Sequence, residues 1–207
     1  MSLSDEDIEK MKAKIKHELE PLMNKILSLS DEDLLEFGEE YKHYLIQYII
    51  SSNIIKSFTL EYDVNVLSTS IKEQVFLLYT YLGMVESLGN WTANILIMLL
   101  IASGKDFHIK TPIVRHVYSL DDLEKKYVPL KMKLNFLREF GIKTYPSIFD
   151  NKLRNDIAHF KFKIENNEVT MKGKKVWELI YPNIRRIQGA NAVIGELFDD
   201  LGKTLGW

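Results

Sequence analysis

The chain has 207 residues, with 27 basic and 29 acidic side chains and no cysteine. This length allows one compact domain with an extension. The lack of cysteine excludes disulfide frameworks, thiolate metal sites and cysteine nucleophiles. Hydrophobic residues make up 46% of the chain, which excludes a disordered protein. The acidic N-terminus has no basic segment followed by an apolar run, so we expect no secretory signal and a cytoplasmic location.

Charge is unevenly distributed along the chain. Residues 131–186 contain 13 Lys and Arg against 6 Asp and Glu, whereas the remainder contains 14 against 23. A basic segment in an acidic protein can be a binding surface for phosphate or nucleic acid. A solvated lysine-rich face explains the same numbers and, on charge alone, is the more common case. Lys outnumbers Arg by 22 to 5, which fits a prokaryotic, AT-rich coding background.

Four serines predict helix starts, because each is followed three residues later by an acidic residue. The serine and the acidic side chain can each accept a free N–H of the first turn. The pairs are Ser4 with Asp7, Ser30 with Asp33, Ser70 with Glu73, and Ser119 with Asp122. Apolar residues at intervals of three and four predict an amphipathic first helix from Ile8 to Ile26. Pro21 is expected to bend or interrupt it.

Residues 31–51 form the second predicted helix, which becomes strongly apolar and should end buried. Residues 71–102 are apolar on most sides, which is typical of a central helix pair or one long bent helix in a bundle. Their two almost wholly apolar stretches, 75–85 and 93–102, are each about half of the roughly 20 residues that a membrane span requires. We therefore expect buried helices that end at Gly104.

A later apolar stripe, from Leu120 to Leu137, predicts a helix that ends at Gly141 and that Pro129 splits, and a closing helix follows between residues 184 and 201. Two stretches break the helical pattern. Residues 58–66 alternate as a half-buried strand does, although an extended linker gives the same pattern. Residues 160–173 predict a β-hairpin, because the central Asn166-Asn167 tolerates the positive φ angles of tight turns.

Together these elements predict an all-α protein. The expected architecture is an up-and-down helical bundle over residues 66–207, with a small β-hairpin near 160–173. Residues 1–65 are expected to form an N-terminal helical extension that packs on this core. No internal repeat or Pro/Gly-rich linker marks the boundary between the two parts.

The common cofactor and catalytic motifs are missing from the sequence. There is no phosphate-cradling glycine loop, no His-Glu-x-x-His zinc pattern and no Gly-x-Ser-x-Gly nucleophile elbow. We therefore expect no cofactor and no metal. Four of the five histidines have no partner at a useful spacing and are expected to be structural or on the surface. These are His17, His43, His108 and His116.

His159 differs, because it closes the segment Arg154-Asn155-Asp156-Ile157-Ala158-His159. On a helix Asn155 and His159 share a face. Arg154 is five residues from His159, so the two side chains converge only if the helix loosens near Ala158 or a second subunit contributes. A structural interpretation is equally simple, with an Asp150–Arg154 ion pair and a histidine that favours the helix dipole.

The string RNDIAHF, on a helix that opens into a hairpin, resembles the Arg-x4-His signature of the HEPN superfamily (higher eukaryotes and prokaryotes nucleotide-binding domain). Arg154, Asn155 and His159 match its positions one for one, and the helical pattern agrees from about residue 70 to the C-terminus. Residues 1–65 carry no motif of the family. The hairpin is a feature of only some members.

The resemblance implies a metal-independent endoribonuclease that cleaves single-stranded RNA as a homodimer, with both motifs at the subunit interface. It implies His159 as general base or acid, Arg154 as phosphate clamp and Asn155 as an orienting hydrogen-bond partner. The expected product is a 2′,3′-cyclic phosphate. Flanking lysines would hold the RNA backbone, namely Lys152, Lys161, Lys163, Lys172, Lys174 and Lys175.

Two alternatives to the nuclease remain open at this point. Many HEPN-like bundles are binding modules, so the protein can instead be a non-catalytic helical dimer that pairs with a nucleotidyltransferase or similar antitoxin. The second alternative is a purely structural helical protein whose motif only caps a helix. Cleavage of RNA separates the toxin-like nuclease from both.

Overall fold

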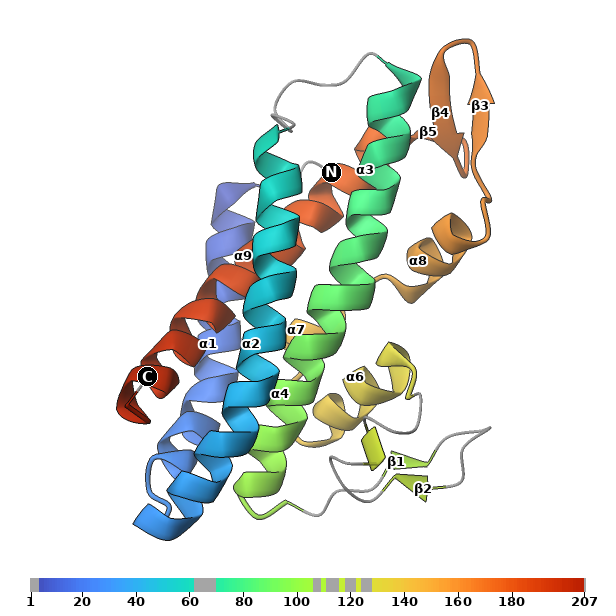
Figure 1. The fold of residues 1–207 in the computed structure, drawn as a ribbon. Coiled ribbons are helices and arrows are strands. Elements are labelled where there is room, and N and C mark those ends of the chain that lie inside the picture. The colour runs from blue at the N-terminus through green and yellow to red at the C-terminus, as the bar shows by residue number, and fades with distance from the viewer. Residues whose placement is uncertain are drawn as a thin grey trace.

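The computed structural model describes residues 4–61, 70–105, 109–110, 116–117, 122–123 and 128–206, and in these the protein is mostly helical (Figure 1). The long helices are α1 (Asp5–Ile26), α2 (Asp31–Glu61), α3 (Ile71–Gly83), α4 (Gly89–Ala102) and α9 (Val176–Thr204). The shorter helices are α6 (Leu130–Glu139), α7 (Thr144–Ser147) and α8 (Asn151–Ala158). This architecture confirms the predicted all-α bundle with a small hairpin.

The long helices pack around one apolar core. Helix α9 packs against α1 and α3, while α2 and α6 pack against α4 (Figure 1). A π-helical segment, η1 (Met84–Leu88), joins α3 to α4. In the described residues this run, Ile71–Ala102, is long and apolar enough to cross a membrane, but 72% of its most apolar window is buried inside the protein. That burial is typical of the central helix of a bundle.

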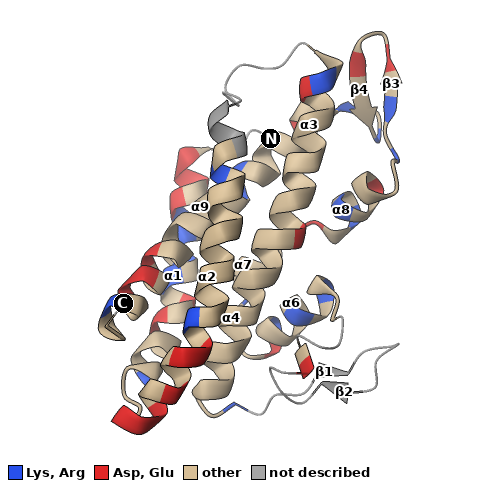
Figure 2. Ribbon diagram, viewed as in Figure 1, with Lys and Arg blue, Asp and Glu red and all other residues tan. Residues whose placement is uncertain are grey.

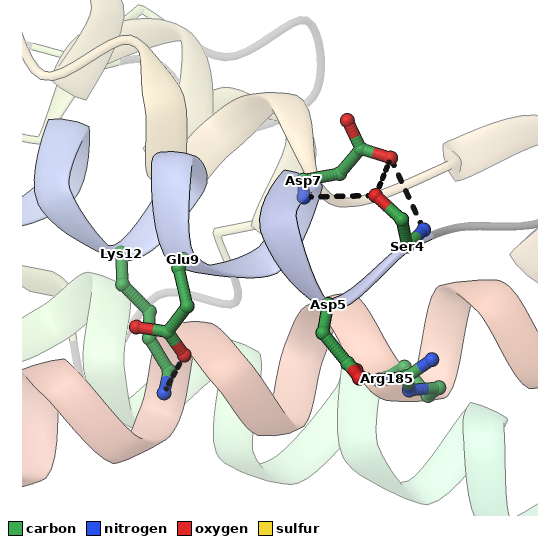
Figure 3. Close-up of polar contacts among 6 residues, drawn as sticks. All are labelled: Ser4, Asp5, Asp7, Glu9, Lys12 and Arg185. Atoms are coloured by element: carbon green, nitrogen blue, oxygen red, sulfur yellow. Dashed lines mark hydrogen bonds and ion pairs between the residues drawn. The ribbon is translucent and has the colours of Figure 1, made fainter.

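The first helix begins with a capping box (Figure 3). The backbone N–H of Asp7 donates to Ser4 Oγ at 3.1 Å, and the backbone N–H of Ser4 donates to Asp7 Oδ2 at 3.1 Å. Asp5, at the same helix end, forms an ion pair with Arg185 of α9. These contacts satisfy two free N–H groups and fix the start of α1 beside α9.

Two further predicted caps are also confirmed. The N–H of Asp33 donates to Ser30 Oγ at 3.2 Å at the start of α2, and the N–H of Glu73 donates to Ser70 Oγ at 3.3 Å at the start of α3. Ser119 lies outside the described residues, so the fourth pair stays a prediction.

Helix α1 approaches α9 closely because Gly189 has no side chain. A Cβ at this position would lie 2.8 Å from Cγ2 of Ile8 and 3.3 Å from Cε of Met11. The missing side chain lets the two helices bury their apolar faces against each other.

Helices α1 and α2 both continue past the points where the sequence indicated a break; at Pro21 the predicted interruption is wrong, and the predicted bend stays a prediction. Helix α1 continues through Pro21, which does not interrupt it; the carbonyl of His17 that loses its partner belongs to an exposed residue, where water can bind it. Helix α2 continues to Glu61, so residues 58–61 are helical and not a strand. Extending a formed helix costs little where no Gly or Pro stops it. Residues 62–66 lie outside the described residues.

Glycine follows the ends of α4 and α6 as expected. Gly104 has φ +79° after α4, and Gly141 has φ +92° after α6. Pro129 is the N-cap of α6, so this helix begins directly after the proline. Residues 124–127 lie outside the described residues, so a helical segment that ends at the proline stays a prediction. The predicted boundary at residue 65 also lies outside the described residues, so the division into 1–65 and 66–207 stays a prediction.

The predicted hairpin is present and belongs to a three-stranded antiparallel sheet. Its strands are β3 (Lys163–Glu165), β4 (Glu168–Met171) and β5 (Lys174–Lys175), in the order β3-β4-β5. Asn166 and Asn167 have φ of 51° and 64°, which confirms the predicted turn. Strand β5 was not predicted; Gly173, with φ 72°, turns the chain into it. A separate short pair, β1 (Ile109–Lys110) with β2 (His116–Val117), was also not predicted.

Candidate functional site

Helix α8 carries the motif and is fixed at its start by Asp150. The carboxylate of Asp150 accepts the N–H of Leu153 at 2.9 Å, and the buried side chains of Leu153 and Ile157 face the core. The predicted Asp150–Arg154 ion pair is wrong, because Asp150 caps the helix while Arg154 binds Glu86 of η1.

The helix ends at His159, which is its C-cap and is exposed to solvent. The N–H of Phe160 donates to the carbonyl of Ile157 at 3.0 Å, and the N–H of Lys161 donates to that of Asp156 at 2.8 Å. This pair of bonds is a Schellman motif. The helix thus ends directly after Ala158. This is the place where it has to loosen if Arg154 and His159 of one chain are to converge.

Phe160 occupies the left-handed position of this cap, with φ 54°. Glycine or asparagine normally fills such a position, because a side chain there is strained. The side chain of Phe160 is also 66% exposed. Its ring lies 6.2 Å from the ring of Phe162. An exposed aromatic ring is therefore held beside His159 at a cost in backbone energy.

Arg154 is anchored on both of its sides. Its Nε donates to a carboxylate oxygen of Glu86, and its Nη1 donates to Asn155 Oδ1 at 2.8 Å. The side chains of Arg154 and Glu86 are 29% and 33% exposed. The guanidinium is thus fixed in orientation while part of it still reaches solvent, which suits an anion that arrives from outside.

Glu86 belongs to the π-helical segment η1, the wider turn between α3 and α4. Such turns are rare and are frequent at functional sites. Further along the run, Asn90 Nδ2 donates to the carbonyl of Glu86 at 2.6 Å, and Lys133 Nζ of α6 donates to Asn90 Oδ1 at 3.2 Å. A row of polar groups therefore leads from α6 to the partner of Arg154.

Lys133 is only 6% exposed. No carboxylate of the described residues lies within 4 Å of its Nζ. Burial lowers the pKa of Lys133 from 10.5 to about 8, because the charged ammonium loses its water. The row thus contains a group that can gain or lose a proton slightly above neutral pH.

Asp156 connects α8 to the sheet. Its carboxylate binds Lys172 at 2.8 Å and Lys161 at 3.3 Å. The hydrogen bond from Lys172, reinforced by Lys161, lowers the pKa of Asp156 below its ordinary value despite burial. Gln74 of α3 holds the other side of the sheet, because its Oε1 accepts the N–H of Val169 at 2.7 Å.

The six lysines predicted to bind RNA lie on α8, on the sheet and in the turns beside them, and all are exposed. Lys161 and Lys172 bind Asp156, and Lys175 binds Glu168. The other three have no ion-pair partner among the described residues, namely Lys152, Lys163 and Lys174. Figure 2 shows basic residues on α6, α8 and β3, whereas acidic residues gather on α1, on the start of α2 and on the C-terminal part of α9.

The structure thus places Arg154 and Asn155 in contact and His159 at the exposed end of the same helix. Sequence reasoning missed Glu86, Lys133 and Phe160. The one available signal was Glu86, an acidic residue inside an apolar run of 32 residues. No group of three or more His, Asp or Glu side chains able to hold a metal occurs in the described ranges.

Comparison with family models, with curated proteins and with solved structures finds no match to this chain.

Proposed function

We propose that this protein is a metal-independent endoribonuclease of the HEPN type, which cleaves single-stranded RNA in the cytoplasm in a toxin-like role. The observation that carries the proposal is the end of α8. There an exposed His159 follows an arginine that Glu86 and Asn155 hold in place. This arrangement supplies a proton-transfer group and a fixed cation next to the same basic sheet.

The chemistry needs no nucleophile from the protein. The 2′-OH of the RNA attacks the adjacent phosphorus, the O2′–P bond forms, and the P–O5′ bond breaks. One imidazole accepts the proton of the 2′-OH, and an acid protonates the departing O5′. His159 takes one of these roles, Arg154 stabilises the charge on the phosphoryl oxygens, and Asn155 orients the guanidinium. The products are a 2′,3′-cyclic phosphate and a 5′-hydroxyl.

The surroundings of His159 suit a single strand. Lys152, Lys163 and Lys174 are exposed and can bind phosphates in a salt-dependent manner. The exposed ring of Phe160 offers a surface on which an unpaired base can stack. A duplex would hide its bases from that ring, so single-stranded RNA is the favoured substrate.

A homodimer supplies what one chain lacks. Each chain offers one His159, whereas the reaction uses both a base and an acid, and two-fold symmetry provides the second imidazole. Sedimentation of the purified protein tests this part. A dimer is expected, and a strictly monomeric active enzyme would contradict it.

The nuclease is tested by incubating the protein with single-stranded RNA in excess EDTA. Wild type should cleave, and His159→Ala should lose cleavage about 10²–10⁴-fold while its far-UV spectrum and melting temperature are retained. His17→Ala is the matched control, because His17 is also an exposed histidine on a helix. Equal cleavage by wild type and H159A would remove the assignment.

One observation favours the second candidate, a non-catalytic module that pairs with a nucleotidyltransferase or similar antitoxin. Helix α2 exposes a run of isoleucines at 40% or more, namely Ile46, Ile49, Ile50 and Ile54. An exposed apolar stripe of this kind is typical of a protein-binding surface. This candidate predicts a stable complex with a separate chain and no cleavage by wild type or H159A.

A further inference from the structure

Helix α2 presents an apolar side to solvent, which continues onto α3. The exposed isoleucines of α2 recur at intervals of three and four, so they lie on one side of the helix. They are Ile46, Ile49, Ile50 and Ile54. Tyr79 of α3 is 45% exposed and lines the same hollow as Ile54. We call these four isoleucines and Tyr79 the isoleucine face. An exposed apolar surface of this kind is typical of a site that binds another macromolecule.

A hollow of about 210 Å³ lies between α2 and α3, next to Ile54. Phe76 and Tyr79 of α3 form part of its wall. The hydroxyl of Ser87 donates to the hydroxyl of Ser51 at 2.8 Å, so these two polar groups of the lining already bind each other. The hollow therefore fits an apolar side chain of a partner.

A second hollow, of about 580 Å³, lies on the α9 side of α2. Ile49 of the isoleucine face lines it, together with the exposed residues Glu196 and Asp199 of α9. Among the described residues of this lining, Lys56 carries the only positive charge. A lysine or arginine side chain of a partner would match this hollow, because it has an apolar stem and a cationic end.

The start of α2 adds negative charge to the same side of the helix. Three exposed glutamates precede the isoleucines at helical spacing, namely Glu32, Glu36 and Glu39. Figure 2 shows this acidic start of α2 and the acidic C-terminal part of α9. The glutamates and the two acidic residues of the second hollow outnumber the exposed lysines of this side of α2, Lys42 and Lys56. Charge complementarity therefore favours a basic partner over an RNA or an anionic membrane.

We propose that the isoleucine face binds an amphipathic helix of another protein, which carries lysine or arginine beside its apolar side chains. The apolar residues of this helix contact the isoleucines, and one of them fills the hollow between α2 and α3. Its basic residues lie against the carboxylates of α2 and α9. The proposal does not depend on RNA cleavage, and it applies to a nuclease and to a non-catalytic module alike.

A synthetic peptide tests the proposal. The probe is a fluorescent helix of leucine and lysine with about 18 residues, or about five turns, and all leucines lie on one side. The full-length protein should bind it with a dissociation constant below about 100 µM, measured by fluorescence anisotropy, and the affinity should fall as salt rises. A peptide with glutamate in place of lysine, and a scrambled peptide of the first composition, should each bind at least tenfold more weakly.

Two substitutions in the protein separate the apolar contact from the charged one. Ile50→Lys places a charge in the isoleucine face and should weaken binding of the lysine peptide at least tenfold. Glu39→Lys reverses a charge beside it and should weaken binding at least threefold. Ile164→Lys and Glu20→Lys are the matched controls and should bind as wild type does, because Ile164 of β3 is 49% exposed, as Ile50 is at 48%, and Glu20 is an exposed glutamate of α1.

No binding of the lysine peptide to wild type, equal binding of the glutamate peptide, or unchanged binding by folded I50K would each overturn the proposal. RNA cleavage by I50K should equal that of wild type, so the two functions are measured separately. A second copy of the chain and a membrane are the other possible occupants of the face. Wild type and I50K should sediment alike, and wild type should not bind phosphatidylcholine vesicles. A dimer that I50K dissociates, or vesicle binding that I50K loses, would overturn the proposal.

Discussion

The contact between α1 and α9 and the contact between α8 and η1 are built in opposite ways. Between α1 and α9, Ile8 of α1 is buried, whereas the carboxylate of the ion pair, Asp5, is 91% exposed. Between α8 and η1, the carboxylate of the ion pair, Glu86, is only 33% exposed, while the aromatic ring of Phe160 lies in solvent.

This difference indicates that the α1–α9 contact stabilises the fold, whereas the α8–η1 contact serves another purpose. Burial of apolar surface stabilises the α1–α9 contact, and its exposed ion pair contributes little. At α8 the protein keeps half-buried charges and a strained phenylalanine, both of which cost stability. Such costs are typical of functional sites, where charge and exposure serve a ligand. Substitutions matched between the two regions test this interpretation.

The largest expected difference is between the two arginines. Arg154→Ala should lower RNA cleavage about 10²–10³-fold, because it removes the fixed cation that stabilises the transition state in the proposed mechanism. Arg154→Lys should recover little, since an ammonium cannot form the forked contacts. Arg185→Ala, the matched change in the α1–α9 contact, should leave cleavage within about twofold and change the free energy of unfolding by less than about 1 kcal/mol. Initial cleavage rates measure both, and equal rates in R154A and R185A would contradict the comparison.

Burying Lys133 in the polar row is expected to cost folding stability. The pH dependence of the free energy of unfolding tests this. Its pKa in the folded protein is about 8, below the ordinary 10.5. Between these values the unfolded chain binds the additional proton, so stability due to this group rises as the pH rises from 8 to 10.5. The full effect is roughly 3 kcal/mol.

Lys133→Met removes that titration. The variant should be more stable than wild type at pH 7, and the difference should shrink towards pH 10.5. Urea unfolding of both proteins at several pH values measures it. A difference that stays constant over this range would show that burial of the ammonium carries no such cost.

Replacing Phe160 by glycine should weaken the binding of single-stranded RNA and stabilise the fold. Phe160→Gly relieves the positive φ and should stabilise the fold by about 0.5–1 kcal/mol, but it should weaken binding of single-stranded RNA by about 1–3 kcal/mol through loss of stacking. Phe160→Tyr keeps both ring and strain and should bind as wild type does. RNA titration and urea unfolding give the two values. A less stable F160G that binds RNA normally would mean that the ring serves the fold.

The smallest expected effect concerns the α1–α9 contact. Gly189→Ala should destabilise the protein by about 1–2 kcal/mol, because the new methyl meets Cγ2 of Ile8 and outweighs the gain in helix propensity. Gly202→Ala, in the same helix, meets Leu45 only at 3.8 Å and should stabilise by about 0.5–1 kcal/mol. Urea unfolding of the pair measures this, with both variants retaining RNA cleavage.

Local chemistry made part of the fold predictable from the sequence. The caps at Ser4, Ser30 and Ser70, the stop at Gly104 and the turn at Asn166-Asn167 each depend on residues close in the chain, and the structure contains all of them. The position of His159 at the end of its helix followed from the same kind of reasoning.

Contacts between distant residues were not predictable in this way. Glu86 and Arg154 are 68 residues apart in sequence, and their meeting depends on a π-helical turn that periodicity does not reveal. The burial of Lys133 depends on how α6 packs against α4. Residues 58–61 alternate like a strand but are helical, because α2 continues through them.

In the proposed function, the α8 end of the molecule cleaves RNA with the 2′-OH of the RNA as nucleophile. The direct measurement is mass spectrometry of the termini that the protein leaves on one single-stranded RNA in EDTA, beside the same strand carrying 2′-O-methyl groups. We expect 2′,3′-cyclic phosphates and 5′-hydroxyls from the first strand and no cleavage of the second. Cleavage of the methylated strand, or 5′-phosphate termini, would contradict it.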